Sequence, residues 1–350
     1  MSTSIITPTS TIVANNNTNN NNNSNNTSLV MVPFPSKTTM PLHITSTLRS
    51  SIVVSSTLDI YESSVNSFLQ FCTYHSLTGQ TSYDVDIYLS QYMESLYQNS
   101  IPNGKQHAAN TLFGIIRRCP QYKLLFPLYR QSLKGYQKLI QSISHIPLTY
   151  YTCVAMSAVM TKSGYLHRAI ALLLMFHCYL RVGEMESLLI SDIALPEQNR
   201  FGSNTILSAL RIGKAKTGRN QTVSITDTHI HILLQSIIVN RLPTEKLFSF
   251  SASAFTRTFH QSLSTLGLSN MFVPHSCRHG GATHDHIHGM NIEQIMLRGR
   301  WKSNESARTY IQSLRAVMLT VNIPIHIHTM GETCAKDLSN NLFNLALTQL

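Results

Sequence analysis

Beyond its N-terminal segment, the chain carries apolar residues at helical spacing, and one short stretch departs from that pattern. In residues 55–72 and 84–96, apolar side chains fall three or four positions apart, as on the buried face of an amphipathic helix. Strand-like sequence is found at Thr205–Gly213 and Gln221–Ile225, on either side of the basic turn 214–219. The pattern therefore predicts a mainly α fold with a small antiparallel β-sheet.

Residues 1–50 differ from the rest of the chain in composition. Positions 15–26 hold ten asparagines, interrupted only by Thr18 and Ser24. Such a polar tract cannot bury enough apolar surface to offset the entropy of ordering it. We therefore expect a disordered tail. Asparagine runs can also self-associate, but a compositionally biased tail without a specific function is the simpler interpretation.

A second break divides the remaining chain. The sequence Ile146-Pro-Leu-Thr149 interrupts the helical pattern and predicts a linker. We expect a helical unit of four helices at residues 51–146 and a larger unit at 147–330 that contains the small sheet. Residues 331–350 carry leucines at helical spacing and predict a short amphipathic C-terminal helix.

Three helices expected in the larger unit matter for its function. One covers residues 167–189, with a bend near Leu180. A second covers His275–His288 and ends at a glycine, and a third covers Ser303–Gln312, with the serine as its N-cap. These helices are expected to carry most of the residues discussed below.

Several classes of protein are disfavoured by the sequence. The longest apolar run, 169–176, is far shorter than the ~20 residues that span a bilayer. The N-terminus has no basic region followed by an apolar stretch, so we expect no secretory signal. The six cysteines are scattered without a Cys-x-x-Cys pair, which argues against a disulfide framework or a zinc ribbon. An intracellular protein with reduced thiols is the plain interpretation.

The charge of the chain is sparse but one-sided. Lys and Arg number 27 against 16 Asp and Glu, a net charge of +11, although only 12% of residues are charged. This imbalance predicts a polyanionic partner, either nucleic acid or an anionic membrane surface. A membrane surface would require a basic amphipathic helix, which we do not find in the sequence.

One part of the helical unit concentrates this positive charge. Residues 105–138 contain seven basic residues and no acidic one, so this half of the unit could face a phosphate backbone. An ordinary solvated face would have the same composition. The cations that we expect to contact DNA, here and in the basic turn, are Lys105, Arg117, Arg118, Lys123, Lys134, Lys138, Lys214 and Arg219.

Three separated segments place a cation in an otherwise apolar surrounding. Arg181 interrupts an apolar helical stretch, and Glu184 follows at a spacing from which it could orient the guanidinium. The basic turn contributes Lys214 and Lys216. Each signal is weak when taken singly, because an Arg–Glu pair at this spacing is usually a structural ion pair.

The third segment is His275-Ser-Cys-Arg278. Its histidine and arginine lie one helical turn apart, so both project from one face. Trp301, the only tryptophan, and Tyr310, the only tyrosine after residue 179, follow downstream. A single His-x-x-Arg occurs often by chance, and only the combination with the other segments is specific.

In this order and at these intervals, the residues resemble those of the tyrosine recombinases, the integrase-like enzymes of DNA strand exchange. The resemblance covers about residues 55–330. It rests on motifs in the catalytic part and on the helix pattern in the N-terminal part. Arg181 falls at the family's first catalytic arginine, and Lys216 at its β-hairpin lysine. His275 and Arg278 fall on its His-x-x-Arg box.

The downstream residues extend the resemblance. Trp301 falls where the family has His or Trp, and Tyr310, nine residues later, falls on the nucleophile. The sequences Arg278-His-Gly-Gly-Ala-Thr283 and Gly299-Arg-Trp-Lys-Ser303 resemble recombinases of eukaryotic mobile elements, the DIRS-like elements and cryptons. Tyr179 departs from the glycine of many members, at a position that varies in the family.

The chemistry that the resemblance implies accounts for these residue types. Attack on a phosphodiester develops negative charge on its non-bridging oxygens, which two arginines, Arg181 and Arg278, can clamp without a metal. A tyrosine hydroxyl ordinarily ionises only near pH ~10, so Tyr310 needs a base, which the resemblance assigns to His275. The 3′-phosphotyrosine product conserves the bond energy, so religation needs no ATP.

Two further roles follow from the same resemblance. A hairpin lysine would protonate the leaving 5′-oxygen; Lys216 is favoured over Lys214 by the Thr-Gly that follows it, but both stay open. Trp301 would donate its indole N–H to a phosphate oxygen. His284 and His288 have a spacing that could hold zinc, but no glutamate accompanies them and a glycine follows at once, so we expect no metal site.

The resemblance also implies an architecture and partners. A C-shaped clamp of two domains would close on double-stranded DNA, and a homotetramer would form at synapsis from monomers or dimers. The segment 331–350 would dock on a neighbouring protomer, the alternative being that it packs on its own domain. No cofactor, membrane or small-molecule substrate is expected. The location would be intracellular, and nuclear in a eukaryote.

Two alternatives to a recombinase remain open. A type IB topoisomerase would use the same chemistry as a monomer that relaxes supercoils, although the resemblance to it is poorer. A DNA-binding regulator with the same fold could be catalytically silent. Such a protein would tend to lose Tyr310 or an arginine, whereas this sequence keeps the whole set.

Overall fold

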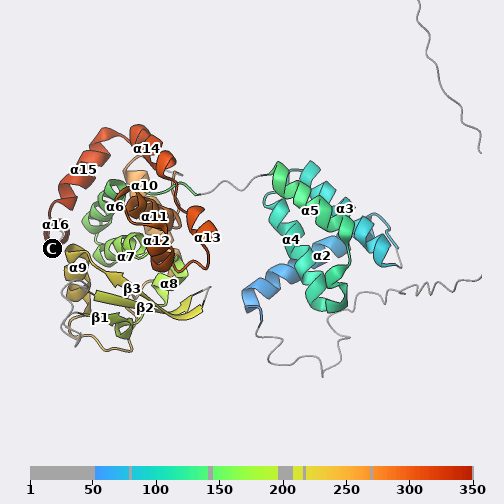
Figure 1. Cartoon of the computed structure of the whole chain (residues 1–350), viewed down its shortest axis with the longest axis horizontal. Coiled ribbons are helices and arrows are strands. Elements are labelled where there is room, and N and C mark those ends of the chain that lie inside the picture. Colours follow the sequence, from blue (N-terminus) through green and yellow to red (C-terminus); the bar gives the residue numbers. More distant parts are fainter. Residues whose placement is uncertain are drawn as a thin grey trace, which may run out of the picture. The chain divides into compact units, whose positions relative to one another are not determined.

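The computed structural model describes residues 52–78, 81–140, 145–195, 208–215, 218–268 and 271–348. The predicted disordered tail lies outside these residues. The chain divides into two compact units, Met1–Ser142 and Ile143–Leu350, which we describe separately (Figure 1). No described helix is both long and apolar enough to cross a membrane.

The first unit is a small helical bundle, as the apolar spacing predicts. Asp86, although buried, is satisfied because its carboxylate accepts the backbone N–H groups of Leu128 and Tyr129 at 2.9 and 2.8 Å and so caps a helix. Thr81 opens another helix through a reciprocal capping box with Asp84. The elements are α2 (Ser55–Tyr74), α3 (Ser82–Gln98), α4 (Gly104–Arg118), the 3₁₀ turn η2 (Pro120–Leu124) and α5 (Pro127–Leu139).

The second unit is mainly helical and carries a three-stranded antiparallel sheet of order β1-β2-β3, which confirms the predicted fold class. Its first half contains α6 (Tyr150–Lys162), α7 (Leu166–His177), α8 (Val182–Glu186), η3 (Ile190–Asp192), β1 (Ile193–Ala194), β2 (Ser208–Ala215), β3 (Gly218–Ile225) and α9 (Thr228–Ile238). Its second half contains α10 (Ala252–Thr265), α11 (Ser276–Ile287), α12 (Ile292–Gly299), α13 (Asn304–Arg308), α14 (Ser313–Asn322), α15 (Ile325–Ala335) and α16 (Leu338–Leu347).

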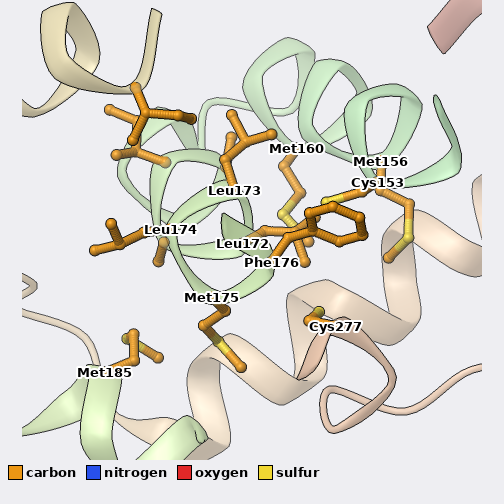
Figure 2. Packing of buried hydrophobic residues seen from close by; sticks show 14 of the residues in the cluster. Cys153, Met156, Met160, Leu172, Leu173, Leu174, Met175, Phe176, Met185 and Cys277 are labelled. Atoms are coloured by element: carbon orange, nitrogen blue, oxygen red, sulfur yellow. The ribbon is translucent and has the colours of Figure 1, made fainter. Parts of the chain in front are cut away.

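Helix α7 forms the centre of this unit. Every residue from Ala169 to Phe176 is buried, so the helix is apolar on all sides and must be covered all round. It packs against α6, α9 and α11 (Figures 1 and 2). Sulfur-bearing side chains, among them Met160, Met185 and Cys277, fill the space around it in Figure 2.

Two adjacent glycines bring α11 close to this core. A Cβ on Gly280 would lie 2.0 Å from the carbonyl oxygen of Leu148, and one on Gly281 would lie 2.0 Å from that of Phe176. Any side chain at either position would therefore push the helix away from α7 and from the segment before α6. The glycine pair fixes where the N-terminus of α11 lies, and with it the His-x-x-Arg residues.

The expected bent helix over 167–189 is wrong. Helix α7 ends at His177, and Tyr179 has a positive φ of 48°. The reversal is closed by a 3.0 Å hydrogen bond from the Leu180 N–H to the Met175 carbonyl. A separate short helix, α8, begins only at Val182.

Other boundaries differ in smaller ways. Lys214 and Arg219 pair across β2 and β3, so the strands extend into the stretch that we expected to be a turn. The helix expected over Ser303–Gln312 is only α13, which ends at Arg308 and leaves Tyr310 beyond it. Helices α14 and α15 follow where the sequence pattern predicted none.

The C-terminal helix α16 is present, as expected from its leucines. In the single chain it packs against α6 and α9, and Leu338 and Leu342 are completely buried in the core of their own unit. This is the alternative to docking on a neighbouring protomer. All six cysteines are free thiols.

Candidate active site

Arg181 stands at the start of α8 and not within a helix as expected. Its backbone is extended (φ −82°, ψ 155°) in the N-cap position. Glu184 accepts the Arg181 Nη1 at 2.6 Å through Oε1, and the Arg181 backbone N–H at 2.9 Å through Oε2. The carboxylate therefore orients the guanidinium, as the spacing predicted. The Arg181 side chain is 24% exposed, so part of it faces outward.

His275 and Arg278 come from the N-terminal turn of α11. His275 is the N-cap residue and is half-buried, whereas Arg278 is fully buried. The Arg278 guanidinium donates to the carbonyl oxygens of Tyr179 and Gly299. Its two partners belong to the turn after α7 and to the end of α12, so three chain segments meet at this side chain.

Trp301 packs in a stack of rings just after α12. Its ring centroid lies 5.9 Å from that of Tyr179 and 4.6 Å from that of Tyr310. The Arg278 guanidinium carbon lies 4.6 Å from the centre of the indole. Within the described part of the chain, the indole N–H is buried and has no hydrogen-bond acceptor. A buried N–H left unpaired costs stability, so it is a candidate donor to a ligand.

Tyr310 is half-buried and follows the last turn of α13. Its ring centroid lies 4.5 Å from the ring of His279 and 5.7 Å from that of His275, and the Arg278 guanidinium lies 5.3 Å away. The buried Thr283 hydroxyl donates to the Tyr310 carbonyl oxygen at 3.1 Å. The same hydroxyl accepts the N–H of the residue two positions after the tyrosine at 3.1 Å.

The surroundings of the two histidines keep them neutral. Burial, then Arg278, His145 and Arg181, lower the pKa of His275 to about 4. Burial and the neighbouring imidazoles lower the pKa of His279 to about 3. A neutral imidazole can accept a proton, so His275 has the charge state that a base requires at neutral pH.

Arg300, which was not among the predicted site residues, lies inside this cluster. Its side chain is 2% exposed and its Nη2 donates to Glu184 Oε2 at 2.9 Å. Its local sequence does not single it out, because Arg298 and Lys302 lie two positions away on either side. Thr283 was missed as well, and no sequence pattern indicates that its hydroxyl reaches Tyr310.

The predicted hairpin lysine cannot be placed. Lys216 lies outside the described residues, and Lys214 and Arg219 are described only through their backbone pairing. The structure therefore brings together Arg181, His275, Arg278, Trp301 and Tyr310. The hairpin lysine that would act as the general acid is not placed with them.

The cations predicted to contact DNA in the first unit have different surroundings. Lys123, Lys134 and Lys138 are exposed. Arg118 forms an ion pair with Glu62, and the Lys105 Nζ donates to the Ile140 carbonyl at 2.9 Å. Arg117, also in α4, is half-buried. The three exposed lysines are thus the members of this set most open to a polyanion.

Comparison with known proteins bears on the second unit. Residues 153–317 match the model of the phage integrase family. This stretch is a phage integrase domain. It contains Arg181, His275, Arg278, Trp301 and Tyr310, so the predicted resemblance to the integrase-like recombinases is confirmed for this stretch. No curated protein matches the sequence.

Solved structures show the same fold. The Tn1549 transposon integrase in complex with transposon right-end DNA is 15% identical, with a TM-score of 0.55 over 79% of this chain and 96% of that one. A lambda integrase tetramer bound to a Holliday junction is 15% identical, with a TM-score of 0.54 over 76% and 74%. The XerH site-specific recombinase bound to difH is 18% identical, with a TM-score of 0.51 over 69% and 73%.

Proposed function

We propose that the protein is a site-specific DNA recombinase that cleaves and rejoins strands through a 3′-phosphotyrosine. The observation that carries the proposal is the convergence of His275, Arg278 and Trp301 on Tyr310 inside a phage integrase domain. The charge of Arg181 acts on both His275 and Arg278. Two guanidiniums around an aromatic side chain and its base fit an in-line attack on a phosphodiester. The neighbours with the same fold include recombinases and integrases bound to DNA.

The cleavage step can be written from these side chains. The Tyr310 hydroxyl oxygen forms a bond to phosphorus, and its proton passes to the neutral imidazole of His275. The bond from phosphorus to the 5′-oxygen breaks, and a hairpin lysine, Lys216 or Lys214, protonates that oxygen. Because the guanidiniums supply the positive charge, the proposed step uses neither a metal ion nor ATP.

Arg278 must become accessible for this step. It is completely buried, and the rings of Trp301 and Tyr310 lie over its guanidinium. A phosphate can therefore reach it only if the tyrosine ring moves aside. The unpaired indole N–H of Trp301 would be exposed by the same movement and could donate to a phosphate oxygen.

Partners follow from the same reasoning. Double-stranded DNA is the substrate that we propose, and the exposed Lys123, Lys134 and Lys138 of the first unit would contribute phosphate contacts. A homotetramer at synapsis is the assembly that we propose, since strand exchange pairs two duplexes and a lambda integrase tetramer shares the fold. A cellular location with access to DNA is required.

A trapping experiment tests the proposal. Randomised duplexes with a nick close to the cleavage position lose a short fragment after attack, so a covalent protein–DNA adduct accumulates and can be isolated in denaturing gels and sequenced. We expect adducts with the wild type and none with Tyr310→Phe, at unchanged DNA binding. Binding without any adduct would favour the silent regulator, and adducts from Tyr310→Phe would refute the assigned nucleophile.

A further inference from the structure

Arg300 links several parts of the site through one buried side chain. Its Nη2 donates to Glu184 Oε2 at 2.9 Å and to the Tyr179 carbonyl at 3.0 Å. Its Nη1 donates to the carbonyls of Cys178 and Arg298, each at 3.0 Å. The guanidinium therefore ties the end of α12 to the turn after α7 and to the first turn of α8.

The backbone at this position makes the choice of residue informative. Arg300 caps α12 in the left-handed conformation, with φ 58° and ψ 36°. Residues with a Cβ rarely adopt it, and glycine is the usual residue where a helix ends in this way. An arginine here carries a conformational cost that glycine would avoid, so its guanidinium must contribute something in return.

The Arg300 guanidinium contributes by its hydrogen bond to one of the two carboxylate oxygens of Glu184. Oε1 accepts the Arg181 Nη1 at 2.6 Å, whereas Oε2 accepts the Arg181 backbone N–H and the Arg300 Nη2, each at 2.9 Å. Burial alone would raise the pKa of Glu184, but Arg300, the Arg181 backbone N–H and guanidinium, and Arg278 hold it below its usual range. Glu184 is therefore a carboxylate, and its second oxygen is already occupied.

We propose that Arg300 is a positioning residue for DNA cleavage, an inference that rests on the proposed function. By occupying Oε2 of Glu184, it leaves the Arg181 guanidinium held through Nη1, with its exposed part directed to the scissile phosphate. Arg300 and Arg278 also donate to the same Tyr179 carbonyl, so Arg300 links the positions of Arg181 and Arg278.

Removal of Arg300 has a definite expected consequence. Oε2 of Glu184 would then accept only the Arg181 backbone N–H, so one of its lone pairs would open to the Arg181 guanidinium. A carboxylate and a guanidinium that meet through two donors form a two-point fork. Arg181 would turn toward Glu184, and the carboxylate would neutralise more of its charge. The chemical step should suffer, while DNA binding, which depends on many phosphate contacts, should change little.

The sharpest variant is Arg300→Gly, which removes the guanidinium and also relaxes the backbone. On a nicked duplex recovered by the trapping experiment, at saturating DNA, we expect single-turnover cleavage to slow about 10- to 100-fold, the effect of a small displacement of a catalytic group. The matched control is Arg257→Ala on α10. Its side chain is exposed, so its cleavage rate at saturating DNA should stay within about threefold of wild type.

A neutral substrate separates positioning from general damage. A methylphosphonate at the scissile position removes a negative charge that Arg181 would bind. If Arg300 acts through Arg181, the deficits of Arg300→Gly and Arg181→Ala both shrink on this substrate. In addition, the double variant is no slower on the phosphate than Arg181→Ala alone.

The outcomes separate the proposed function from the role of Arg300. A wild type that forms no adduct overturns the proposed function. If the wild type cleaves, three results would overturn the role of Arg300 alone. Arg300→Gly could cleave as fast as the wild type, its deficit could be the same on both substrates, or its deficit could add to that of Arg181→Ala. If Arg300→Gly does not fold, Arg300→Asn, which tolerates the left-handed conformation but removes the guanidinium, is measured in the same way with the same criteria.

Discussion

The two units use their cations in opposite ways. In the first, the lysines Lys123, Lys134 and Lys138 are exposed, and the buried carboxylate Asp86 is satisfied by neutral backbone amides. In the second, the buried carboxylate Glu184 accepts hydrogen bonds from two guanidiniums. Burying cations is costly unless they are paired. Among the described residues of the second unit, the buried cations Arg278 and Arg300 both lie beside Glu184 and Trp301.

Histidines show the same contrast. In the first unit, burial by itself lowers the pKa of His107. In the second, burial, Arg278, His145 and Arg181 together lower that of His275 to about 4. The difference indicates that the second unit concentrates positive charge where a phosphate would enter, which is typical of a catalytic centre and not of a surface that only binds.

The largest expected effect on cleavage comes from replacing an arginine of the second unit by lysine. Arg278→Lys keeps the charge but loses the planar fork that reaches two carbonyls and a phosphate. We expect adduct formation to fall about 10²- to 10³-fold, and Arg181→Lys to act in the same direction. The matched control in the first unit is Arg118→Lys, which keeps an ion pair with Glu62 and should leave the cleavage rate within about twofold. Similar losses in both units would remove the distinction between them.

Replacement of the hairpin lysine should have the next largest effect. We expect Lys216→Ala to slow cleavage about 100-fold, within the range of general acid catalysis. A 5′-bridging phosphorothioate has a leaving group that needs no proton, so it should restore the rate. Lys214→Ala is the paired control, because the two lysines are the alternatives for the acid. Rescue of Lys214→Ala instead would assign the acid to Lys214, and rescue of neither would exclude both.

The sequence predicted those parts of the molecule that depend on local pattern. The apolar spacing located the helices of the first unit, and the strand signals located the hairpin. Arg181 stood out because it occurs among apolar neighbours. The His-x-x-Arg spacing placed His275 and Arg278 in one helical turn, and the structure shows them there.

Features that depend on tertiary contacts were not predictable in this way. The reversal at Tyr179 requires a positive φ that the residue does not favour, and its carbonyl is held by Arg278 and Arg300 from elsewhere in the chain. The apolar continuity of residues 167–189 therefore suggested a single helix. Arg300 was overlooked for a related reason, since the partners that connect it to the site, Cys178, Tyr179 and Glu184, lie more than a hundred residues away in sequence.

The exposed lysines of the first unit offer a test of binding without chemistry. A triple variant, Lys123→Ala, Lys134→Ala and Lys138→Ala, should weaken DNA binding by about tenfold and reduce the slope of log affinity against log salt by up to ~2.7. Cleavage at saturating DNA should be unchanged. A triple Lys→Arg variant keeps the charge and serves as the control. Unaltered salt dependence would show that these side chains do not face the phosphates.

A smaller effect is expected from the hydroxyl that holds the nucleophile segment. Thr283→Val removes the hydrogen bond to the Tyr310 carbonyl but preserves the shape of the side chain. We expect cleavage to slow about three- to tenfold, because the tyrosine is less well positioned. Thr283→Ser retains the hydroxyl and should cleave at the wild-type rate. Equal losses in both variants would point to packing instead of the hydrogen bond.

The smallest change in cleavage rate is expected when the pH is varied, and a rate that stays constant is the informative result. A base with a pKa of about 4 is neutral above that value, so kcat/KM for cleavage, which reports the DNA-free enzyme, should vary by less than about twofold between pH 5.5 and 8. With an ordinary histidine pKa near ~6.5, the rate would instead fall about tenfold by pH 5.5. Since the folded-state pKa of His275 is depressed, its contribution to stability is present above pH ~6.5 and is lost as pH falls toward 4. His145→Asn removes one cause of the shift and should move the fall in rate to higher pH. A bend near pH 6.5 in the wild type would show that burial and the neighbouring cations do not lower the pKa of His275 during cleavage.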